Sequence, residues 1–351
     1  GFSPVLSIAV VLLIDGFFAI SGAIGTPVIA GLEMPLGLDL ESVSFIYFFA
    51  AIAVLFAGTV IIGFIYTYLK KESEGKIGWS GWILYVVMMI PFTVSAYFFR
   101  ELAGIVASVF MAVFSYFFLF EHKKFHWKPW IPYIVLVFLL LIPKIFPWFA
   151  DLLAYELDFS SLYGTEVNAS LQPFRSPLIP FVASAMFALY RVKDFTVDLK
   201  PVVSKTFAVF LVLFPSLAIT QLMMNSGNEM PSMIEAIADV FVKTGNAYPL
   251  FSPLIGVIGA FITGSTTVSN IIFGPVQYKA AISLGMKTEI ILSLQLAGAS
   301  LGNAVCLFNI IAAAAVAGLS KFNDILKKNL LPVAIASVII FFFGFVLFWL
   351  L

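Results

Sequence analysis

The sequence predicts an all-α protein that crosses a membrane several times, and both its composition and its run lengths indicate this fold class. Hydrophobic residues make up 62% of the 351 residues and charged residues 11%, whereas soluble domains have about 45–50% and about 25%. Many apolar runs exceed about 18 residues, the length of a membrane-spanning helix. The runs at 43–69 and 331–351 are apolar on all sides, unlike the alternating strands of a transmembrane barrel. We therefore expect a polytopic helical protein in the lipid bilayer of the plasma membrane.

Apolar segments follow one another along the chain, each bounded by charged residues, proline or glycine. They cover residues 4–30, 43–69, 82–99, 102–120, 130–149, 177–190, 206–224, 250–284, 289–319 and 331–351. The segments at 250–284 and 289–319 are interrupted by GSTTVSN and by LGNAVCLFN. Because non-helical backbone at membrane depth persists only where it is buried in protein or lines a cavity, such breaks indicate a solute site.

Lysine and arginine gather in alternate loops, which the positive-inside rule places on the cytoplasmic side. These loops are at 70–76, 123–128, 191–205 and 321–328, and acidic loops at 151–166 and 229–239 alternate with them. The alternation continues to the last basic loop only if 250–284 is a re-entrant hairpin that turns at 264–270 and returns to the face it entered. The amphipathic stretch 233–242 is expected along the outer membrane interface.

The chain offers no pattern for a metal, a cofactor or a nucleic acid. Lys plus Arg equals Asp plus Glu, so no basic surface predicts a nucleic-acid partner. Cys306 is the single cysteine and is interpreted as a packing residue in an apolar helix. His122 and His126 lie four apart in a basic loop and lack the glutamate of a zinc-binding HExxH helix. The chain starts at Gly1 without the features of a signal peptide, so we expect further helices before it.

A short internal echo suggests two related parts. GAIGTPV at 22–28 is followed by LGLDLE, and GAFITGSTTV at 259–268 is followed by LGMKTE, each leading into a long apolar run. Secondary transporters are often built from two such repeats, whose interrupted helices form a site near the membrane midplane. We expect one membrane transport domain over 1–351, with a first broken-segment repeat at 1–70, connecting transmembrane helices at 71–224 and a second repeat at 225–351.

Three motifs resemble those of the bacterial and archaeal L-lactate permeases. They are GTPV at 25–28, GSTTVSN at 264–270 with FGPVQ at 273–277, and GNAVCLFNIIAA at 302–313. Members of this family are secondary carriers that take up lactate, and often glycolate, together with protons. The resemblance implies uptake of L-lactate, D-lactate or glycolate by proton symport with alternating access, and no enzymatic activity.

The chain also departs from the family pattern at three places. An acidic residue and a glycine usually stand close before the GTPV turn, and the candidates here, Asp15 and Gly16, lie further away. Thr266 stands where a polar or acidic residue often precedes a threonine, and Phe308 stands where a histidine is frequent. These differences leave the coupling ion and the exact substrate open.

The polar residues of the broken segments are the candidate substrate site. A 2-hydroxymonocarboxylate needs hydrogen-bond donors and a favourable potential, which the N-termini of half-helices supply. Pro27 and Pro275 are expected in the first turn of restarted helices. The residues expected to bind substrate are Gly25, Thr26, Gly264, Ser265, Thr266, Thr267, Ser269, Asn270, Gln277, Gly302, Asn303 and Asn309. The alternative is that these hydroxyls and amides bond within or between helices and that the glycines serve helix packing.

Asp15 is the carboxylate most clearly placed within an apolar run, in VLLIDGFFAI. An intramembrane carboxyl is costly and is by default a candidate proton or ion site. We therefore expect Asp15 to couple proton and solute movement, with helix capping as the alternative. Arg100 and Glu101 lie between two apolar runs and are expected to form a tight external turn with a salt bridge, with a membrane-embedded pair as the alternative.

Two other functions stay open at this level. A sodium-coupled symporter for dicarboxylate or gluconate is the nearest alternative, although the broken segments at 250–284 and 4–30 contain only one cationic residue, Lys279, which favours a monoanion. An anion channel would need a ring of charges or a carbonyl filter, and neither pattern is evident. The sequence is compatible with a homo-oligomer but does not define its state.

Overall fold

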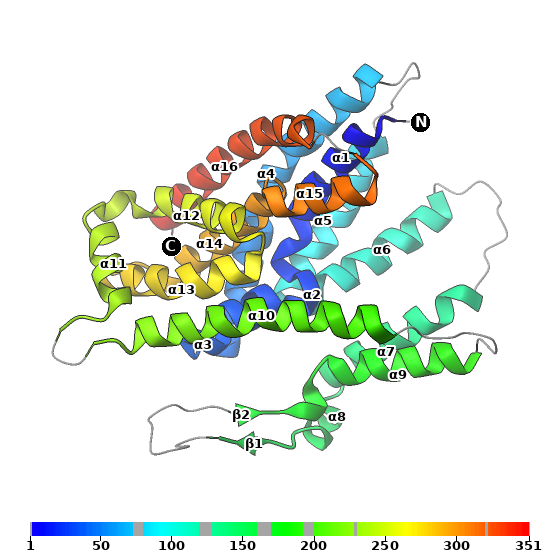
Figure 1. The fold of residues 1–351 in the computed structure, drawn as a ribbon, viewed down its shortest axis with the longest axis horizontal. Helices are drawn as coiled ribbons and strands as arrows, with labels where there is room; N and C mark the ends of the chain where they lie inside the picture. Colours follow the sequence, from blue (N-terminus) through cyan, green and yellow to red (C-terminus); the bar gives the residue numbers. More distant parts are fainter. Residues whose placement is uncertain are drawn as a thin grey trace. The chain divides into compact units, whose positions relative to one another are not determined.

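The computed structural model describes residues 2–72, 80–118, 128–159, 170–191, 199–227, 230–319 and 322–350 (Figure 1). Helices dominate these residues, and one short antiparallel pair joins β1 (Leu157–Asp158) to β2 (Ser170–Leu171). The α-helices of the described residues are α1 (Pro4–Phe18), α2 (Gly22–Val28), α3 (Met34–Leu36), α4 (Leu40–Glu72), α5 (Ser80–Phe99), α6 (Ala103–Phe118), α7 (Ile131–Ile145), α8 (Pro147–Leu152), α9 (Leu178–Arg191), α10 (Leu199–Met224), α11 (Met233–Val242), α12 (Tyr248–Thr263), α13 (Thr266–Ser283), α14 (Thr288–Asn303), α15 (Leu307–Val316) and α16 (Asn323–Leu350).

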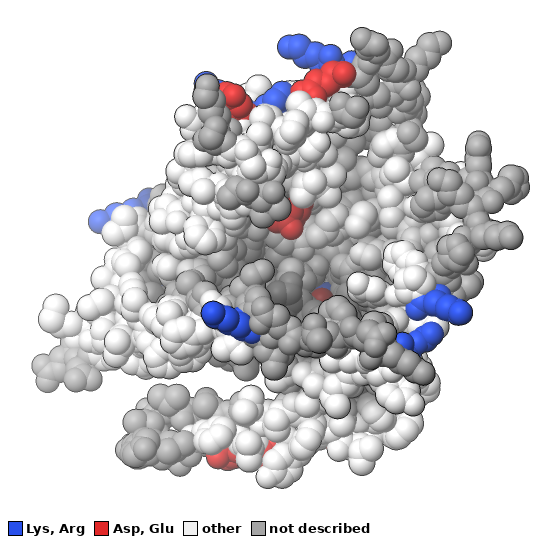
Figure 2. Space-filling view, turned by 45° about the vertical axis from the view of Figure 1, so that its right-hand side comes forward, with Lys and Arg blue, Asp and Glu red and all other residues white. Residues whose placement is uncertain are grey.

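The prediction of an all-α membrane protein is confirmed. Within the described residues, six helical runs are long and apolar enough to cross a membrane: Pro4–Ser21, Leu40–Glu72, Gly81–Phe118, Gly245–Thr263, Thr288–Ala314 and Asn323–Leu347. Large apolar side chains such as Phe98, Ile262 and Phe342 are exposed, and uncharged atoms dominate the described surface in Figure 2. Such a surface suits contact with lipid, so the chain is a multi-pass protein of the cell membrane.

The chain separates into two compact units. One comprises Gly1–Phe114 with Lys205–Leu351, and the other comprises Ser115–Ser204. In the smaller unit, Ser184 Oγ of α9 donates to the carbonyl of Pro132 in α7 at 2.6 Å. The predicted basic loop with His122 and His126 lies outside the described residues. All the broken segments belong to the larger unit.

Two contacts define one end of the larger unit. Ser3 Oγ donates to Glu72 Oε1 at 2.9 Å, and the Tyr68 hydroxyl donates to the Lys328 carbonyl at 2.9 Å. The start of α1, the end of α4 and the start of α16 therefore share one end, here named the lysine-rich end for Lys70, Lys71, Lys327 and Lys328. The described lysines of two predicted basic loops, 70–76 and 321–328, therefore lie at the same end.

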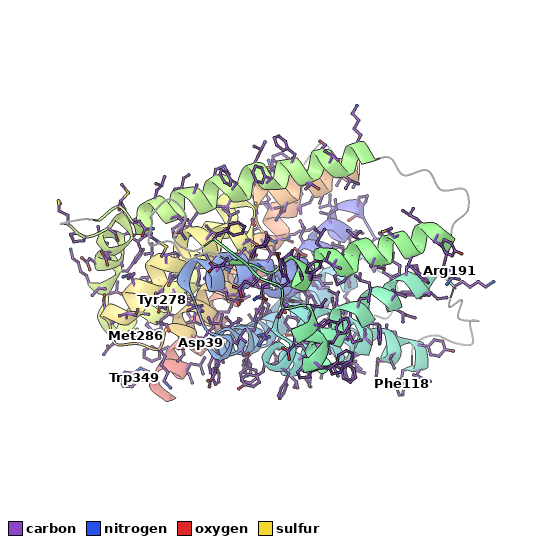
Figure 3. The ribbon with its side chains drawn as sticks, turned by 90° about the horizontal axis from the view of Figure 1, so that it is seen from below. Asp39, Phe118, Arg191, Tyr278, Met286 and Trp349 are labelled. Carbon is purple, nitrogen blue, oxygen red and sulfur yellow. The ribbon has the colours of Figure 1, made fainter. Side chains whose placement is uncertain are left out.

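The other end, here named the opposite end, is where Ser42 Oγ donates to Glu289 Oε1 at 2.9 Å. Both α4 and α14 begin there. Figure 3 shows Asp39, Tyr278, Met286 and Trp349 labelled toward this end. It follows that α1 and α16 run away from the lysine-rich end, whereas α4 and α14 run toward it.

The first segment is a broken helix. After α1 the chain forms a 3-10 turn at Ala19–Ser21, then α2, a π-helical turn at Ile29–Glu33 and α3. Ile24 and Gly25 have positive φ angles of 55° and 76°, a conformation that costs a β-branched residue about 1–3 kcal/mol. The helix continues beyond the predicted limit at residue 30. The placement of Pro27 in a first turn was wrong, because Pro27 lies near the end of α2.

Residues 248–283 form a helical hairpin, in which α12 and α13 run antiparallel (Figure 1). Gly264 has a φ of 73° and Ser265 caps α13, so the turn is shorter than the predicted 264–270. The Tyr248 hydroxyl donates to Gln277 Oε1 at 2.8 Å, which places the start of α12 beside the last turns of α13. The hairpin thus returns to the opposite end, in the shape predicted for a re-entrant segment.

Pro275 lies in the interior of α13, and its predicted place in a first turn was also wrong. A proline has no N–H, so the carbonyl four residues earlier loses its helical partner. Here Thr220 Oγ1 from α10 donates to that carbonyl, of Ile271, at 3.2 Å. A hydroxyl from a neighbouring helix therefore makes the interior proline tolerable.

The last broken segment is α14 with α15, separated by residues 304–306. A Cβ at Gly298 or Gly302 would overlap the backbone of α12 at Pro253 or Val257, so these glycines allow close helix packing. The broken segments α1–α2 and α14–α15 run in opposite directions, and each precedes a long helix, α4 or α16. The two halves of the sequence echo do not correspond to this pair. Residues 22–28 lie in the first broken helix, whereas residues 259–268 lie at the turn of the hairpin.

Candidate functional site

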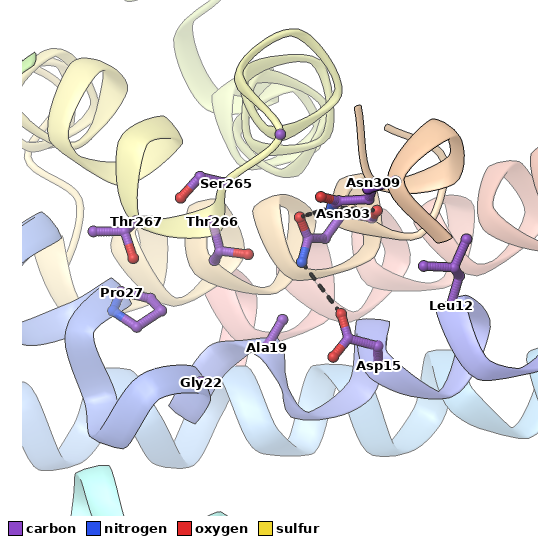
Figure 4. A pocket seen from close by; sticks show the side chains of 12 residues that line it. Leu12, Asp15, Ala19, Gly22, Pro27, Ser265, Thr266, Thr267, Asn303 and Asn309 are labelled. Carbon is purple, nitrogen blue, oxygen red and sulfur yellow. Dashed lines mark hydrogen bonds between the residues drawn. The ribbon is translucent and has the colours of Figure 1, made fainter. Parts of the chain in front are cut away.

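A cavity of about 440 Å³ lies where the three interrupted segments meet (Figure 4). Its lining comes from α1 and the first break, from the hairpin turn and the start of α13, and from both sides of the second break. The lining residues are Leu12, Asp15, Ala19, Gly22, Pro27, Gly264, Ser265, Thr266, Thr267, Asn303, Asn309 and Ala312. The cavity is large enough for a small organic molecule and is walled by both polar and apolar groups.

The N-terminus of α13 faces this cavity. Ser265 is the N-cap, and its Oγ accepts from the Val268 N–H at 3.3 Å. The amides of Thr266 and Thr267 belong to the first turn, which has no intrahelical acceptor for them. The Thr267 hydroxyl makes no hydrogen bond to any residue that the structure describes. Free donors and the positive end of the helix dipole make this wall suitable for an anion.

A chain of polar side chains lies across the cavity from that wall. Asn303 Nδ2 donates to Asp15 Oδ2 at 3.3 Å, and Asn309 Nδ2 donates to Asn303 Oδ1 at 2.8 Å (Figure 4). Asn309 also donates to the Asn303 carbonyl at 3.2 Å. Within the described parts of the chain, Asp15 has no ion-pair partner. The carboxyl is therefore held by the amide of Asn303 and is open to the cavity.

Several predicted site residues lie instead in a buried hydrogen-bond network between α12, α13 and α14. Asn270 Nδ2 donates to the Pro27 carbonyl at 2.9 Å, and Ser269 Oγ donates to the Gly256 carbonyl at 3.2 Å. Gln295 Nε2 donates to both Ser269 Oγ and Asn270 Oδ1, and Gln277 Nε2 donates to Gln295 Oε1. These side chains are fully buried, so they fix the hairpin to the first break.

Carbonyls freed at the breaks are satisfied by side chains from other helices. The Tyr47 hydroxyl donates to the Gly25 carbonyl at 3.1 Å, Ser300 Oγ to the Gly16 carbonyl at 2.7 Å, and Asn329 Nδ2 to the Ala304 carbonyl at 2.9 Å. Membrane-embedded backbone requires such partners. The sequence analysis missed these three donors. Only Tyr47 stood out as a polar group in an apolar run, since Ser300 lies among small residues and Asn329 directly follows two lysines.

The structure divides the predicted site residues into two groups. Those that line the cavity are Asp15, Gly264, Ser265, Thr266, Thr267, Asn303 and Asn309. Those that do not line it are Gly25, Thr26, Ser269, Asn270, Gln277 and Gly302. Gly25 and Gly302 are close-packing positions, because a Cβ would overlap Glu101 and Val257 respectively. Outside the set of residues expected to bind substrate, the cavity is also lined by Leu12, Ala19, Gly22, Pro27 and Ala312.

The turn between α5 and α6 touches the other side of the first break. Arg100 Nε and Glu101 Oε2 lie 3.6 Å apart, with side chains only 19% and 13% exposed. Glu101 packs against Gly25. The expected turn and salt bridge are present, but the pair packs against the first break instead of standing free at the surface, and it supports the left-handed backbone there. No group of His, Cys, Asp and Glu in the described residues could hold a metal ion.

The helical fold and the cavity define a multi-pass membrane protein with a solute-sized cavity of polar and apolar walls at interrupted helices. Comparison with known proteins then identifies it more closely. Residues 121–351 match the L-lactate permease family, and the chain belongs to that family.

Curated relatives agree with this assignment. The chain is 32% identical over 186 residues to a putative L-lactate permease of Haemophilus influenzae, covering 51% of this chain and 35% of the relative. It is 29% identical over 315 residues to an L-lactate permease of Streptococcus iniae, covering 82% and 64%. A glycolate permease of Escherichia coli is 29% identical over 112 residues, covering 30% and 20%. The chain therefore spans between a third and two thirds of the first two relatives, and no solved structure matches it.

Proposed function

We propose that this protein carries L-lactate or a related 2-hydroxymonocarboxylate, such as D-lactate or glycolate, across the cell membrane together with a proton. The observation that supports this most is the cavity in which the N-terminus of α13 faces Asp15 across the space between the breaks. The relatives are named lactate and glycolate permeases, which are transporters rather than enzymes.

The substrate carboxylate would bind at the α13 wall. The free amides of Thr266 and Thr267 and the Thr267 hydroxyl are donors for its oxygens. The amides of Asn303 and Asn309 can both donate and accept, so they suit a 2-hydroxyl group. Among the described lining residues there is no Lys or Arg, which favours a single negative charge over a dicarboxylate.

Proton coupling would depend on Asp15. If its carboxyl is ionised, it repels the substrate anion in the same cavity. Two unit charges about 6 Å apart repel by about 3 kcal/mol at an effective dielectric constant of about 20. Protonation removes this repulsion, so substrate and proton bind together and leave together. Alternating access then follows if the cavity opens in turn to the lysine-rich and the opposite end.

Vesicle transport tests this function. The protein in proteoliposomes should show counterflow of labelled L-lactate, and an imposed inward proton gradient should drive accumulation above equilibrium. A sodium-coupled symporter would need a sodium gradient instead. An anion channel would give lactate flux without counterflow, and either result would contradict the proposal.

A further inference from the structure

A second, smaller cavity lies at the opposite end of the larger unit. Its volume is about 180 Å³, and it shares no lining residue with the first cavity. The residues that line it are Pro35, Leu36, Met224, Asn225, Ser232, Ile234, Pro275, Tyr278 and Lys279. Tyr278 lies in α13 twelve residues after Thr266, which is about 18 Å along a helix at 1.5 Å per residue. One helix therefore contributes to both cavities.

Lys279 gives this cavity a positive charge. Its ammonium donates to Glu235 Oε1 at 3.2 Å, and the two side chains are 45% and 43% exposed. An ammonium has three donors, so the contact with Glu235 leaves two of them available. An ion pair this exposed is weak and exchangeable, and an anion can therefore compete with Glu235 for Lys279.

One hydroxyl adds a neutral donor. The Tyr278 hydroxyl has no hydrogen-bond partner in the described part of the chain. Ser232 Oγ accepts from the Glu235 N–H at 3.2 Å and its side chain also hydrogen-bonds the Glu235 carboxylate, so Ser232 holds the start of α11 rather than offering a donor. The remaining walls are apolar, from Pro35, Leu36 and Ile234. A cation, a hydroxyl and a short apolar wall match a carboxylate that carries a small apolar body.

We propose that this cavity is a second binding site, which takes small monocarboxylate anions at the opposite end before they reach the first cavity. The choice of lactate as its ligand rests on the proposed transport function. The positive-inside pattern places this end outside the cell, so the site serves solute that arrives from outside.

Initial rates of lactate uptake into right-side-out membrane vesicles test the site. Lys279→Gln should raise the half-saturating external lactate concentration about fivefold and leave the maximal rate unchanged. Glu235→Gln should lower it about twofold, because it removes the competing carboxylate while Gln preserves the capping box of α11. Lys287→Gln is the matched control, since Lys287 is an exposed lysine at the same end that does not line the cavity.

Equal effects of Lys279→Gln and Lys287→Gln would overturn the proposal, because they would indicate only a general effect of charge. Loss of maximal rate alone in Lys279→Gln would overturn it too. If wild-type vesicles take up no lactate, the proposed function has failed, and binding is measured separately. Lactate should then raise the Tm of the detergent-solubilised wild type more than that of Lys279→Gln, and equal shifts would overturn the second site.

Discussion

Replacing Asp15 with Asn tests the coupling argument most directly. The two side chains have nearly the same shape, and the Asn oxygen can still accept from Asn303 Nδ2, which lies 3.3 Å from Asp15 Oδ2. The substitution therefore removes a titratable charge from the cavity without removing its known hydrogen bond. We expect Asp15→Asn to retain lactate counterflow and to lose accumulation driven by a proton gradient.

The size of the effect follows from the charge repulsion. About 3 kcal/mol between carboxylates about 6 Å apart, at an effective dielectric constant of about 20, corresponds to roughly a hundredfold change in affinity. In the wild type, the half-saturating lactate concentration should rise with pH by up to that factor, since the ionised form of Asp15 opposes binding. In Asp15→Asn it should stay nearly constant and low, because the side chain is always neutral.

The assay is counterflow and gradient-driven uptake in the same proteoliposomes over a range of pH. Asp39→Asn is a suitable control, because Asp39 accepts from the Ser42 N–H at 2.7 Å at the start of α4, outside the cavity, and Asn also caps helices well. Normal accumulation by Asp15→Asn would refute the role of Asp15. So would a control variant that loses coupling to the same extent.

Four further predictions concern binding and stability. Thr267→Val should raise the half-saturating lactate concentration about tenfold in counterflow with little change in Tm, because one donor to a charged ligand is worth about 1.5–3 kcal/mol. Asn270→Ala should lower the free energy of unfolding by about 2–3 kcal/mol, seen as a lower Tm, because it leaves the buried Pro27 carbonyl without its donor. Gly302→Ala should cost about 1–3 kcal/mol, measured in the same way, because its Cβ overlaps the α12 backbone. Hydrogen bonds from Ser232, and then Lys279, hold the pKa of Glu235 below its usual 4.5. Its stabilising contribution is therefore present above about pH 4.5 and is lost as the pH falls through the lowered value, so Glu235→Gln should reduce the dependence of Tm on pH in that acidic range.

The sequence was sufficient to locate the helices and the breaks. Long apolar runs require helices, and hydroxyl-rich interruptions require a cavity or a protein partner, so each of the apolar segments coincides with helix in the described residues. The sequence was not sufficient to show that Thr267 lines the cavity whereas Asn270 belongs to the buried network. Both are polar and lie within one turn of α13, but a Cβ at Gly31 would press on Asn270. The path of the first segment through Pro27 and the π-helical turn at Ile29–Glu33 brings its backbone against Asn270, and Thr267 is left facing the cavity.

The misplaced prolines have a related cause. The preference for proline in the first turn of a helix assumes that a freed carbonyl inside a helix finds no partner. Thr220 supplies that partner for Ile271, and it comes from a residue 51 positions away. A local pattern does not contain such a long-range donor, so the rule failed at Pro275 even though the helix itself was predicted.

The buried network also restricts how the proposed transport cycle can operate. Gln295, Gln277, Ser269 and Asn270 join α12, α13 and α14 to the Pro27 carbonyl through hydrogen bonds that water does not reach. Breaking these bonds in every cycle would leave several buried polar groups unpaired, each costing about 1–3 kcal/mol. The hairpin, α14 and the part of the first break around Pro27 should therefore move as one body. The same argument ties α1 to this body, because Ser300 Oγ of α14 donates to the Gly16 carbonyl next to Asp15 through a buried bond. The bonds that a substrate can replace are those inside the cavity, from Asn303 to Asp15 and from Asn309 to Asn303, which are exposed or half-buried.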